Sequence, residues 1–410
     1  MALRILYVST IFPYPAHRGG KIRISNIISH LSTRHDVHLV SLCSEHKDEL
    51  DELCRRAREV CAGVRAVPHR RRRWRGGLRS VLHRKPYEVG LHQNAEMDRS
   101  VEQAIMEVDP DLIWCSRLAA LQYLPNDLGA TVLLDQHDLA SRLWKIMSQR
   151  ASKLWIQAYA RYNQGLVERY QQEVYEDVDI CVSVSEEERR LTKQYAPTDT
   201  ALLTAPNGVD VSYFSPSGEI EEERGTLVSV GSMDQTRNVD ASRFFVDEVL
   251  PRLQDRGLDV TYYIVGQNPT DEVQRMEEQP GVVVTGTVDD VRPFLERSAV
   301  MVAPYRMGSG VKHKIPIAFA MGKPVVGTPN ACHGIEVTHE RNVMIAESPA
   351  SFADAIHNLL NSEEKRKNLG EHAQSFIREE YSWRAITEQL LSSIESLIEK
   401  ENVPEARREI

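Results

Sequence analysis

The sequence predicts an α/β protein with two doubly wound, Rossmann-like domains, each built on a parallel sheet. Apolar runs typical of buried strands alternate with longer helical or polar stretches along both halves of the chain. The chain has 410 residues, more than one ordinary hydrophobic core accommodates. Between the halves, residues 207–225 carry turn residues, a proline and a run of charges, so this segment is the expected linker. The first domain is therefore expected over residues 1–206 and the second over 226–380.

The expected strands follow from the apolar runs. In the first domain they are residues 4–9, 36–42, 112–116, 131–136, 179–185 and 201–207. A helix should follow the paired glycines Gly19 and Gly20 and end near Leu31. In the second domain the expected strands are residues 226–231, 260–266, 282–286, 299–304, 323–329 and 342–346. Open α/β sheets bind ligands beyond the carboxyl ends of their strands, so the chemistry is expected in the loops there.

Composition and charge restrict the class of protein. The formal net charge of −9 argues against general nucleic-acid binding. There is no run of 18 or more apolar residues, and Met1 leads directly into a strand-like run, so neither a membrane span nor a signal peptide is expected. The expected compartment is the cytoplasm. The six cysteines are scattered without a CxxC pair, which indicates reduced structural thiols, and no metal site is expected.

One segment reverses the overall charge. Between Glu59 and Glu88 there is no acidic residue, while nine lysines and arginines occur there. Within it, apolar residues fall at helical spacing, at Trp74, Leu78, Val81 and Leu82. This pattern is typical of a short basic amphipathic helix on anionic lipid, with Arg71, Arg72, Arg73 and Trp74 as membrane or acceptor contacts. The alternative is a solvated loop, or a helix that packs Trp74 against its own domain.

A glycine-rich turn carries the clearest ligand signal. The stretch "RMGSGVKHKIPIAFAMGKPVVGTPN", residues 306–330, places two glycines and two lysines directly before an apolar helix. The glycines allow close backbone approach, and the first turn of a helix offers unpaired N–H groups, so an anion is the expected ligand. Arg237 follows the first strand of the second domain near a helix start, where we also expect contact with phosphate.

Several motifs, in their order and spacing, resemble the glycosyltransferase family 4 enzymes of the GT-B fold. They are the Gly19-Gly20 loop, "APNGVDVSYFSP", "VGSMDQTRNVD", "YIVGQNP", "VVVTGTVDDVRPFLERSAVMVAPYRMGSGVKHK", "AMGKPVV" and "YSW" at 381–383. The likeness covers almost the whole chain. It is close to bacterial sugar transferases associated with exopolysaccharide production, which show similar "MDxxxNVD" and "VxDVRP" stretches. The resemblance implies that a final segment, residues 381–410, carries a helix at about 384–399 that returns to the first domain.

The resemblance also implies roles for individual residues. The basic pair that holds the donor diphosphate falls on Ser232 and Arg237, so one basic residue is missing, and Lys314 is expected to help. The glutamate pair of the family falls on Ser309 and Ile317, and neither is acidic. A histidine near the donor sugar corresponds to His137, which follows a strand; the alternative is a structural histidine. The implied catalytic residues are His137, Arg237 and Lys314, and the implied donor-binding residues are Gly19, Gly20, Ser232, Gly266, Ser309, Gly310, Val311 and Ile317.

The resemblance implies transfer of a sugar from a nucleotide-sugar donor to a glycan or lipid-linked acceptor, in polysaccharide or glycoconjugate biosynthesis. Anomeric configuration would be retained, and neither a metal ion nor a cofactor would be needed if positive groups neutralise the leaving nucleoside diphosphate. The first alternative is a non-catalytic GT-B partner that binds a sugar nucleotide or a polysaccharide enzyme, motivated by the missing glutamates. A nucleotide-sugar epimerase is the second. The protein is expected in the cytoplasm or peripherally at the inner face of the cell membrane.

Overall fold

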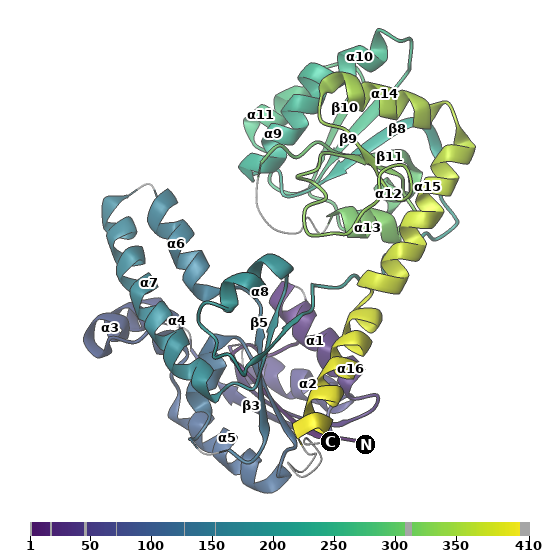
Figure 1. The fold of residues 1–410 in the computed structure, drawn as a ribbon. Helices are drawn as coiled ribbons and strands as arrows, with labels where there is room; N and C mark the ends of the chain where they lie inside the picture. The colour runs from purple at the N-terminus through teal and green to yellow at the C-terminus, as the bar shows by residue number, and fades with distance from the viewer. Residues whose placement is uncertain are drawn as a thin grey trace. The chain divides into compact units, whose positions relative to one another are not determined.

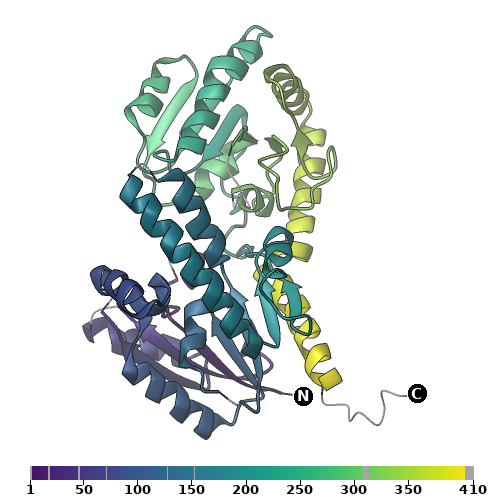
Figure 2. The same ribbon diagram turned by 60° about the vertical axis from the view of Figure 1, so that its left-hand side comes forward.

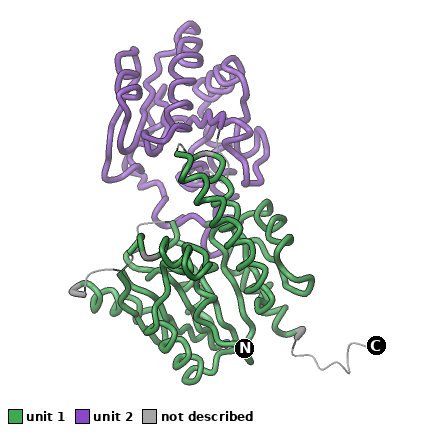
Figure 3. The backbone as a smooth tube through the Cα atoms, turned by 90° about the vertical axis from the view of Figure 1, so that its left-hand side faces the viewer, with its two compact units in different colours: residues 1–207, 386–410 green, residues 208–385 purple. Residues whose placement is uncertain are grey.

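The protein, represented by a computed structural model, is described over residues 2–16, 19–44, 47–70, 72–126, 128–151, 153–307 and 314–401. The chain divides into two compact units (Figure 3). Unit 1 comprises Met1–Asn207 together with Ile386–Ile410, and unit 2 comprises Gly208–Ala385. Most of the segment expected as a linker, from Gly208 onward, therefore groups with unit 2.

Unit 1 is built on a seven-stranded sheet in which every pairing is parallel. Its strand order is β3-β2-β1-β4-β5-β6-β7. The strands are β1 (Arg4–Ser9), β2 (Asp36–Cys43), β3 (Gly63–Pro68), β4 (Leu112–Ser116), β5 (Thr131–Gln136), β6 (Ile180–Ser183) and β7 (Ala201–Thr204). The strand order reverses between β1 and β4, so these two neighbours leave a crevice at their carboxyl ends.

Helices cover both faces of this sheet (Figures 1 and 2). They are α1 (Gly19–Leu31), α2 (Lys47–Arg58), α3 (Arg73–His83), α4 (Tyr87–His92), α5 (Ala95–Val108), η1 (Leu118–Tyr123), α6 (Ala140–Arg150), α7 (Leu154–Val174), η2 (Tyr175–Asp177), α8 (Glu186–Thr192) and most of α16 (Trp383–Glu401). Side chains alternate along a strand, so Ile5 packs in the cluster that contains α1 and α16, whereas Leu6 packs in the one that contains α5 and α7.

Unit 2 repeats the plan with six parallel strands in the order β10-β9-β8-β11-β12-β13. The strands are β8 (Glu223–Val230), β9 (Thr261–Val265), β10 (Val282–Gly286), β11 (Ser298–Ala303), β12 (Val325–Gly327) and β13 (Met344–Ile345). The helices are α9 (Thr236–Phe244), η3 (Phe245–Val249), α10 (Leu250–Gln254), α11 (Asp271–Arg275), η4 (Met276–Glu278), α12 (Arg292–Arg297), α13 (Lys314–Ala320), α14 (Pro349–Leu360), α15 (Glu363–Phe376) and η5 (Ile377–Tyr381). Apolar clusters lie on both faces of this sheet as well.

The α/β prediction with two parallel sheets is confirmed, and so is the helix over the basic segment. β3 was not predicted, because Arg65 interrupts its apolar pattern and most of its residues are half-buried at a sheet edge. β8 begins at Glu223, inside the segment expected as the linker. All six cysteines are buried free thiols, as their spacing predicted. Among the described helices, none is both long and apolar enough to cross a membrane.

Candidate functional site

The predicted catalytic and donor-binding residues that the structure describes fall into two groups, one at the crevice of each sheet. Gly19, Gly20 and His137 belong to unit 1, near the carboxyl ends of β1, β4 and β5. Ser232, Gly266, Arg237, Lys314 and Ile317 belong to unit 2, around the ends of β8, β9 and β11. Ser309, Gly310, Val311 and Arg71 lie outside the described residues, as does the side chain of Arg73.

In unit 2, Lys314 is held across the end of β8. It is the first residue of α13, and its Nζ donates to Asn238 Oδ1 at 3.1 Å. Asn238 Nδ2 in turn donates to the carbonyl oxygen of Ser232 at 2.7 Å. A β-carbon on Gly231 would lie 2.4 Å from Lys314 Nζ, so the absence of a side chain there lets the ammonium reach this position. The arrangement places a positive charge where the strand order reverses between β8 and β11.

Gly266 has a structural reason to be glycine. Its φ of 150° is a conformation that side chains disfavour. A β-carbon there would lie 1.6 Å from the carbonyl oxygen of Gly231, so the close approach between the ends of β8 and β9 requires glycine at this position. Its predicted contact with a donor stays a prediction.

Arg237 differs from the other arginines near α9. It is half-buried in the first turn of α9, and no described residue forms a hydrogen bond or ion pair with its guanidinium. By contrast, Arg306 Nη2 lies 2.6 Å from Asp240 Oδ1 and Arg243 Nη2 lies 3.2 Å from the same oxygen. The hydrogen bond from Arg306 holds the pKa of Asp240 below its ordinary value. Arg237 is therefore placed to meet an anionic ligand.

Ser232 and Ile317 are both engaged within unit 2. Ser232 Oγ donates to Asp234 Oδ1 at 2.7 Å and accepts from Gln267 Nε2 at 3.3 Å. Ile317 is the fourth residue of α13; it is half-buried and packs against an apolar cluster that includes Phe319. Its neighbours are therefore apolar, whereas the resemblance implied a glutamate at this position. Contact of either residue with a donor stays a prediction.

In unit 1, Gly20 lies against Arg117 and His137. A β-carbon on Gly20 would lie 2.9 Å from Arg117 Nη2 and 3.5 Å from His137 Nδ1. Arg117 directly follows β4 and has a φ of 74°, and its N–H donates to the carbonyl oxygen of Asp135 at 3.0 Å. Such a backbone conformation costs about 1–3 kcal/mol in a residue with a side chain and is common at binding sites.

His137 is buried and oriented by its neighbours. Its Nε2 lies 3.0 Å from Ser116 Oγ and 3.5 Å from Asp135 Oδ2. Burial lowers the pKa of His137, and Asp135 only partly opposes this effect. The ring is therefore neutral at pH 7, with the proton on Nε2, since Asp135 can only accept. Nδ1, on the Gly20 side of the ring, is buried and has no hydrogen-bond partner among the described residues.

Three buried charged side chains of unit 1 were not predicted from the sequence: Arg23, Asp135 and Glu188. Arg23 and Asp135 form an ion pair with Nη2 and Oδ1 2.7 Å apart, and their side chains are 1% and 0% exposed. Burial would raise the pKa of Asp135, but the charge of Arg23 and the hydrogen bond to His137 hold it well below its ordinary value. Glu188 is the third: burial and the charge of Asp138 raise its pKa to about 7. A charged residue within the apolar run "TVLLDQ" was the available signal for Asp135.

Comparison with known proteins connects this arrangement to glycosyltransferases. Residues 224–362, which contain the crevice of unit 2, match a family model described as "Glycosyl transferases group 1". An uncharacterized 44.6 kDa protein in the cps region of Klebsiella pneumoniae is 20% identical over 395 residues, covering 93% of this chain and 97% of that protein. The D-inositol 3-phosphate glycosyltransferase of Corynebacterium glutamicum is 27% identical over 255 residues, covering 57% of this chain and 61% of that enzyme.

A solved structure matches over nearly the full length. Anabaena Alr3699/HepE, solved in complex with UDP and glucose, aligns with a TM-score of 0.58 and 14% sequence identity. The alignment covers 96% of this chain and 100% of that chain. Two units with parallel sheets and this likeness identify the fold as GT-B, and the match of residues 224–362 to the glycosyl transferases group 1 model supports a glycosyltransferase.

Proposed function

We propose that the protein is a retaining, metal-independent glycosyltransferase. It would move a sugar from a nucleotide-sugar donor to a glycan or lipid-linked acceptor in polysaccharide or glycoconjugate biosynthesis. The observation that carries the proposal is the positive crevice of unit 2, in which Lys314 is held over Gly231 and Arg237 lacks a partner among the described residues. The family match over this crevice supports it, as does the UDP in the Anabaena structure. The cps-region relative supports an exopolysaccharide context.

Charge neutralisation is the catalytic task of this crevice. When the bond between the anomeric carbon and a phosphate oxygen breaks, negative charge develops on the leaving nucleoside diphosphate. Lys314 and Arg237 would stabilise that charge, which is the role a metal ion plays in other transferases. In a front-face reaction, the acceptor oxygen bonds to the anomeric carbon on the side that the phosphate leaves. The acceptor proton passes to the departing phosphate, and configuration is retained.

The crevice of unit 1 is proposed to orient a hydroxyl group. His137 Nδ1 is a buried acceptor without a partner among the described residues, beside the backbone of Gly20. A neutral imidazole fixed through Nε2 can accept a hydrogen bond from a sugar hydroxyl at the other nitrogen. Asp135 and Ser116 hold the ring, while Arg23 keeps Asp135 ionised.

A peripheral position on an anionic membrane is the proposed location. On α3, Trp74 is 62% exposed and Leu82 is 65% exposed, and Leu78 and Val81 are also largely exposed. We call these four residues the apolar face of α3. The alternative, in which Trp74 packs against its own domain, would leave most of this side chain uncovered. Apolar side chains within a basic segment are the combination that anionic interfaces attract.

The function is tested with the full-length protein and a set of nucleoside diphosphate sugars. UDP binding is measured by calorimetry, release of nucleoside diphosphate is followed with time, and the anomeric configuration of the product is determined by NMR. We expect UDP binding, sugar turnover and a retained configuration. An inverted product would exclude the front-face route, and an epimerised donor would place the protein in another class.

A non-catalytic sugar-nucleotide binder is the second candidate, favoured by the apolar Ile317 where the related enzymes carry a glutamate. The same experiment separates the two candidates. Binding of UDP without turnover of any donor, in the presence of lipid and glycan acceptors, would support the non-catalytic role. Absence of nucleotide binding would defeat both proposals.

A further inference from the structure

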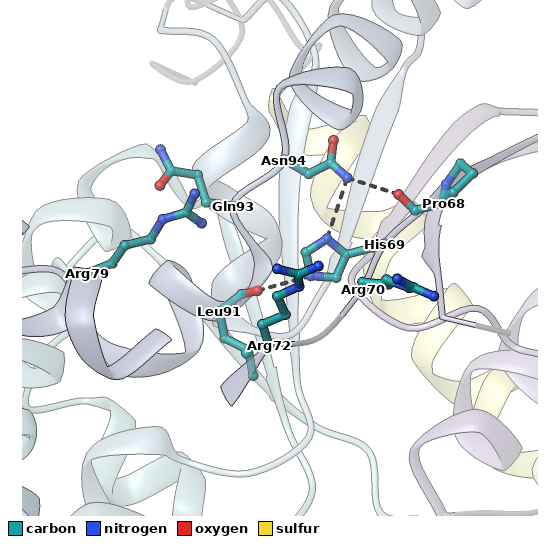
Figure 4. Close-up of a pocket in the computed structure, with 8 residues that line it drawn as sticks. All are labelled: Pro68, His69, Arg70, Arg72, Arg79, Leu91, Gln93 and Asn94. Carbon is teal, nitrogen blue, oxygen red and sulfur yellow. Dashed lines mark hydrogen bonds between the residues drawn. The ribbon is translucent and has the colours of Figure 1, made fainter. Parts of the chain in front are cut away.

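A cavity in unit 1 lies apart from the crevice at β1 and β4. It opens at the end of β3, between the start of α3 and the connection from α4 to α5, and has a volume of about 250 Å³. The residues around it are Pro68, His69, Arg70, Arg72, Arg79, Leu91, Gln93 and Asn94 (Figure 4). Water occupies about 30 Å³ per molecule in the liquid, so the cavity is large enough for a phosphoryl group and part of its ester.

The floor of the cavity is fixed by hydrogen bonds. His69 Nε2 lies 3.0 Å from the carbonyl oxygen of Leu91, and Asn94 Nδ2 lies 3.5 Å from His69 Nδ1 (Figure 4). Because the Leu91 carbonyl can only accept, Nε2 carries a proton and donates to it. Asn94 also donates to the carbonyl oxygen of Pro68 at 3.2 Å, while its Oδ1 accepts from Glu96 N at 2.9 Å as the N-cap of α5. The polar groups of the floor are therefore preorganised.

The charge of the lining is entirely positive. Arg70, Arg72 and Arg79 contribute three guanidinium groups, and no acidic residue lines the cavity. Arg79 Nη1 donates to the carbonyl oxygen of Gly90 at 3.1 Å, which orients this side chain without neutralising it. None of the three arginines forms an ion pair with any residue that the structure describes. Three like charges around one small cavity repel each other, and a doubly charged anion relieves that repulsion.

We propose that this cavity binds a phosphoryl group, in the form of a phosphate monoester or a diphosphate. Arginine matches the oxygens of phosphate in pairs, which favours this anion over a single carboxylate. The site lies outside the donor crevice of unit 2 and therefore goes beyond the proposed function. The phosphoryl group can belong to a lipid or to a soluble compound. The apolar face of α3 favours the lipid, because the helix that carries it also supplies Arg79 to the cavity.

The test uses the full chain without added nucleotide, because UDP is itself a diphosphate and would compete for the cavity. The soluble probe is glycerol 3-phosphate, with binding measured by calorimetry. The lipid probe is a neutral phosphatidylcholine vesicle containing phosphatidic acid, compared with phosphatidylglycerol vesicles of equal surface charge. The variants are Arg70→Gln combined with Arg72→Gln, and Lys85→Gln as a control. Lys85 belongs to the same basic segment but does not line the cavity.

We expect the double variant to lose about tenfold or more in affinity for the phosphomonoester, since charge-assisted hydrogen bonds are removed. Lys85→Gln should change that affinity less than twofold. Binding to phosphatidic acid vesicles with little affinity for glycerol 3-phosphate would assign a lipid source, and the reverse would assign a soluble one. Equal losses of affinity in the double variant and in Lys85→Gln would show that the anion is attracted by the overall charge of the segment and not bound in the cavity. That result would overturn the proposal. Absence of binding to either probe would also overturn it.

Discussion

The ammonium group of Lys314 occupies the space where a side chain on Gly231 would begin. The two residues are 83 positions apart in sequence, yet a β-carbon on Gly231 would lie 2.4 Å from Lys314 Nζ. Asn238 fixes the ammonium through a hydrogen bond of 3.1 Å and is itself tied to the backbone of Ser232. The glycine that directly follows β8 is therefore part of the proposed donor site, although it carries no functional group.

Gly231→Ala should weaken nucleoside diphosphate binding. The added methyl group must displace Lys314 Nζ, because 2.4 Å is far below van der Waals contact. A displaced ammonium loses its position relative to the phosphates, and the loss of a charge-assisted contact amounts to about 1.5–3 kcal/mol. Calorimetry with UDP should therefore show at least a tenfold loss of affinity. Gly165→Ala is the matched control, because a β-carbon on Gly165 in α7 meets nothing within 4 Å. Unchanged UDP affinity in a folded Gly231→Ala protein would remove Lys314 from the donor site.

Arg237→Ala should weaken binding of a nucleoside diphosphate more than of a monophosphate. No described residue neutralises this guanidinium, so its charge is available to the second phosphate in our proposal. The expected loss is about 1.5–3 kcal/mol for the diphosphate. Arg252→Ala, in α10, is the control, because Arg252 donates to the backbone carbonyl of Glu248 in the preceding η3. Comparing UDP with UMP by calorimetry measures the effect, and equal losses for both nucleotides would contradict a contact with the second phosphate.

Glu188→Gln should stabilise the protein at alkaline pH. Burial and the charge of Asp138 raise the pKa of Glu188 to about 7 from an unfolded value of 4.5. Between these values the folded state binds more protons than the unfolded state, so this group's contribution is present below pH 4.5 and is lost as the pH rises to about 7. Glutamine does not ionise, and the variant should therefore gain up to about 3 kcal/mol over the natural protein at pH 8.

Chemical denaturation at pH 5 and pH 8 measures this difference. Glu187→Gln is the control, because Glu187 is exposed and lies 2.8 Å from Arg142 in a surface ion pair. Exposed pairs contribute little to stability, so this variant should not gain stability at pH 8. A Glu188→Gln protein with the same pH dependence as the natural one would show that Glu188 is ionised in the folded state.

The apolar face of α3 should control binding to anionic vesicles. Replacing Trp74 and Leu78 together by alanine removes two of its exposed side chains, and partitioning should fall by at least tenfold. Cosedimentation at increasing salt separates the electrostatic contribution of the basic residues from the apolar contribution, since salt screens only the electrostatic one. Met106→Ala is the control, because Met106 is 77% exposed on α5, away from the basic segment. Binding that depends neither on lipid charge nor on the Trp74 and Leu78 substitutions would show that the apolar face of α3 does not contact the membrane.

The fold was largely accessible from sequence because its strands are buried on both faces. The runs that became β1, β4 and β5 were predicted to the residue, since central parallel strands that are buried on both faces are continuous apolar segments. The edge strand β10 was also predicted to the residue, because no charged residue interrupts its run of valines. β3 escaped because it lies at an edge, where a charged residue such as Arg65 is tolerated. β13 is shorter than the apolar run that predicted it. An edge strand extends only as far as it forms hydrogen bonds with its single neighbour, and the apolar run does not reveal that length.

Only part of the candidate site could be predicted from the sequence. Gly20 and His137 could be proposed because each follows a strand, but their approach to Arg117 depends on a backbone φ that the sequence does not reveal. The ion pair between Arg23 and Asp135 joins residues 112 positions apart, and no local pattern predicts such a pairing. Gly231 could not be connected with Lys314 for the same reason. Pairwise geometry across a sheet is set by topology, whereas strand and helix patterns are local.

Ile317→Glu tests whether α13 faces the ribose of a bound nucleotide. Ile317 is half-buried and packs against apolar neighbours, so the charge should lower stability by about 1–3 kcal/mol, less than in a fully buried position. If the other side of the residue faces a ribose, the carboxylate can accept hydrogen bonds from its hydroxyls and contribute about 1.5–3 kcal/mol. We therefore expect UDP to bind more tightly to the variant, while pyrophosphate, which has no ribose, binds no better.

Ile317→Gln is the uncharged control, and its affinity for UDP should rise less. Calorimetry with both ligands, together with thermal melts with and without UDP, measures the two effects separately. A large loss of stability without any gain for UDP over pyrophosphate would mean that Ile317 belongs to the apolar interior of unit 2, and that the ribose is bound by other residues.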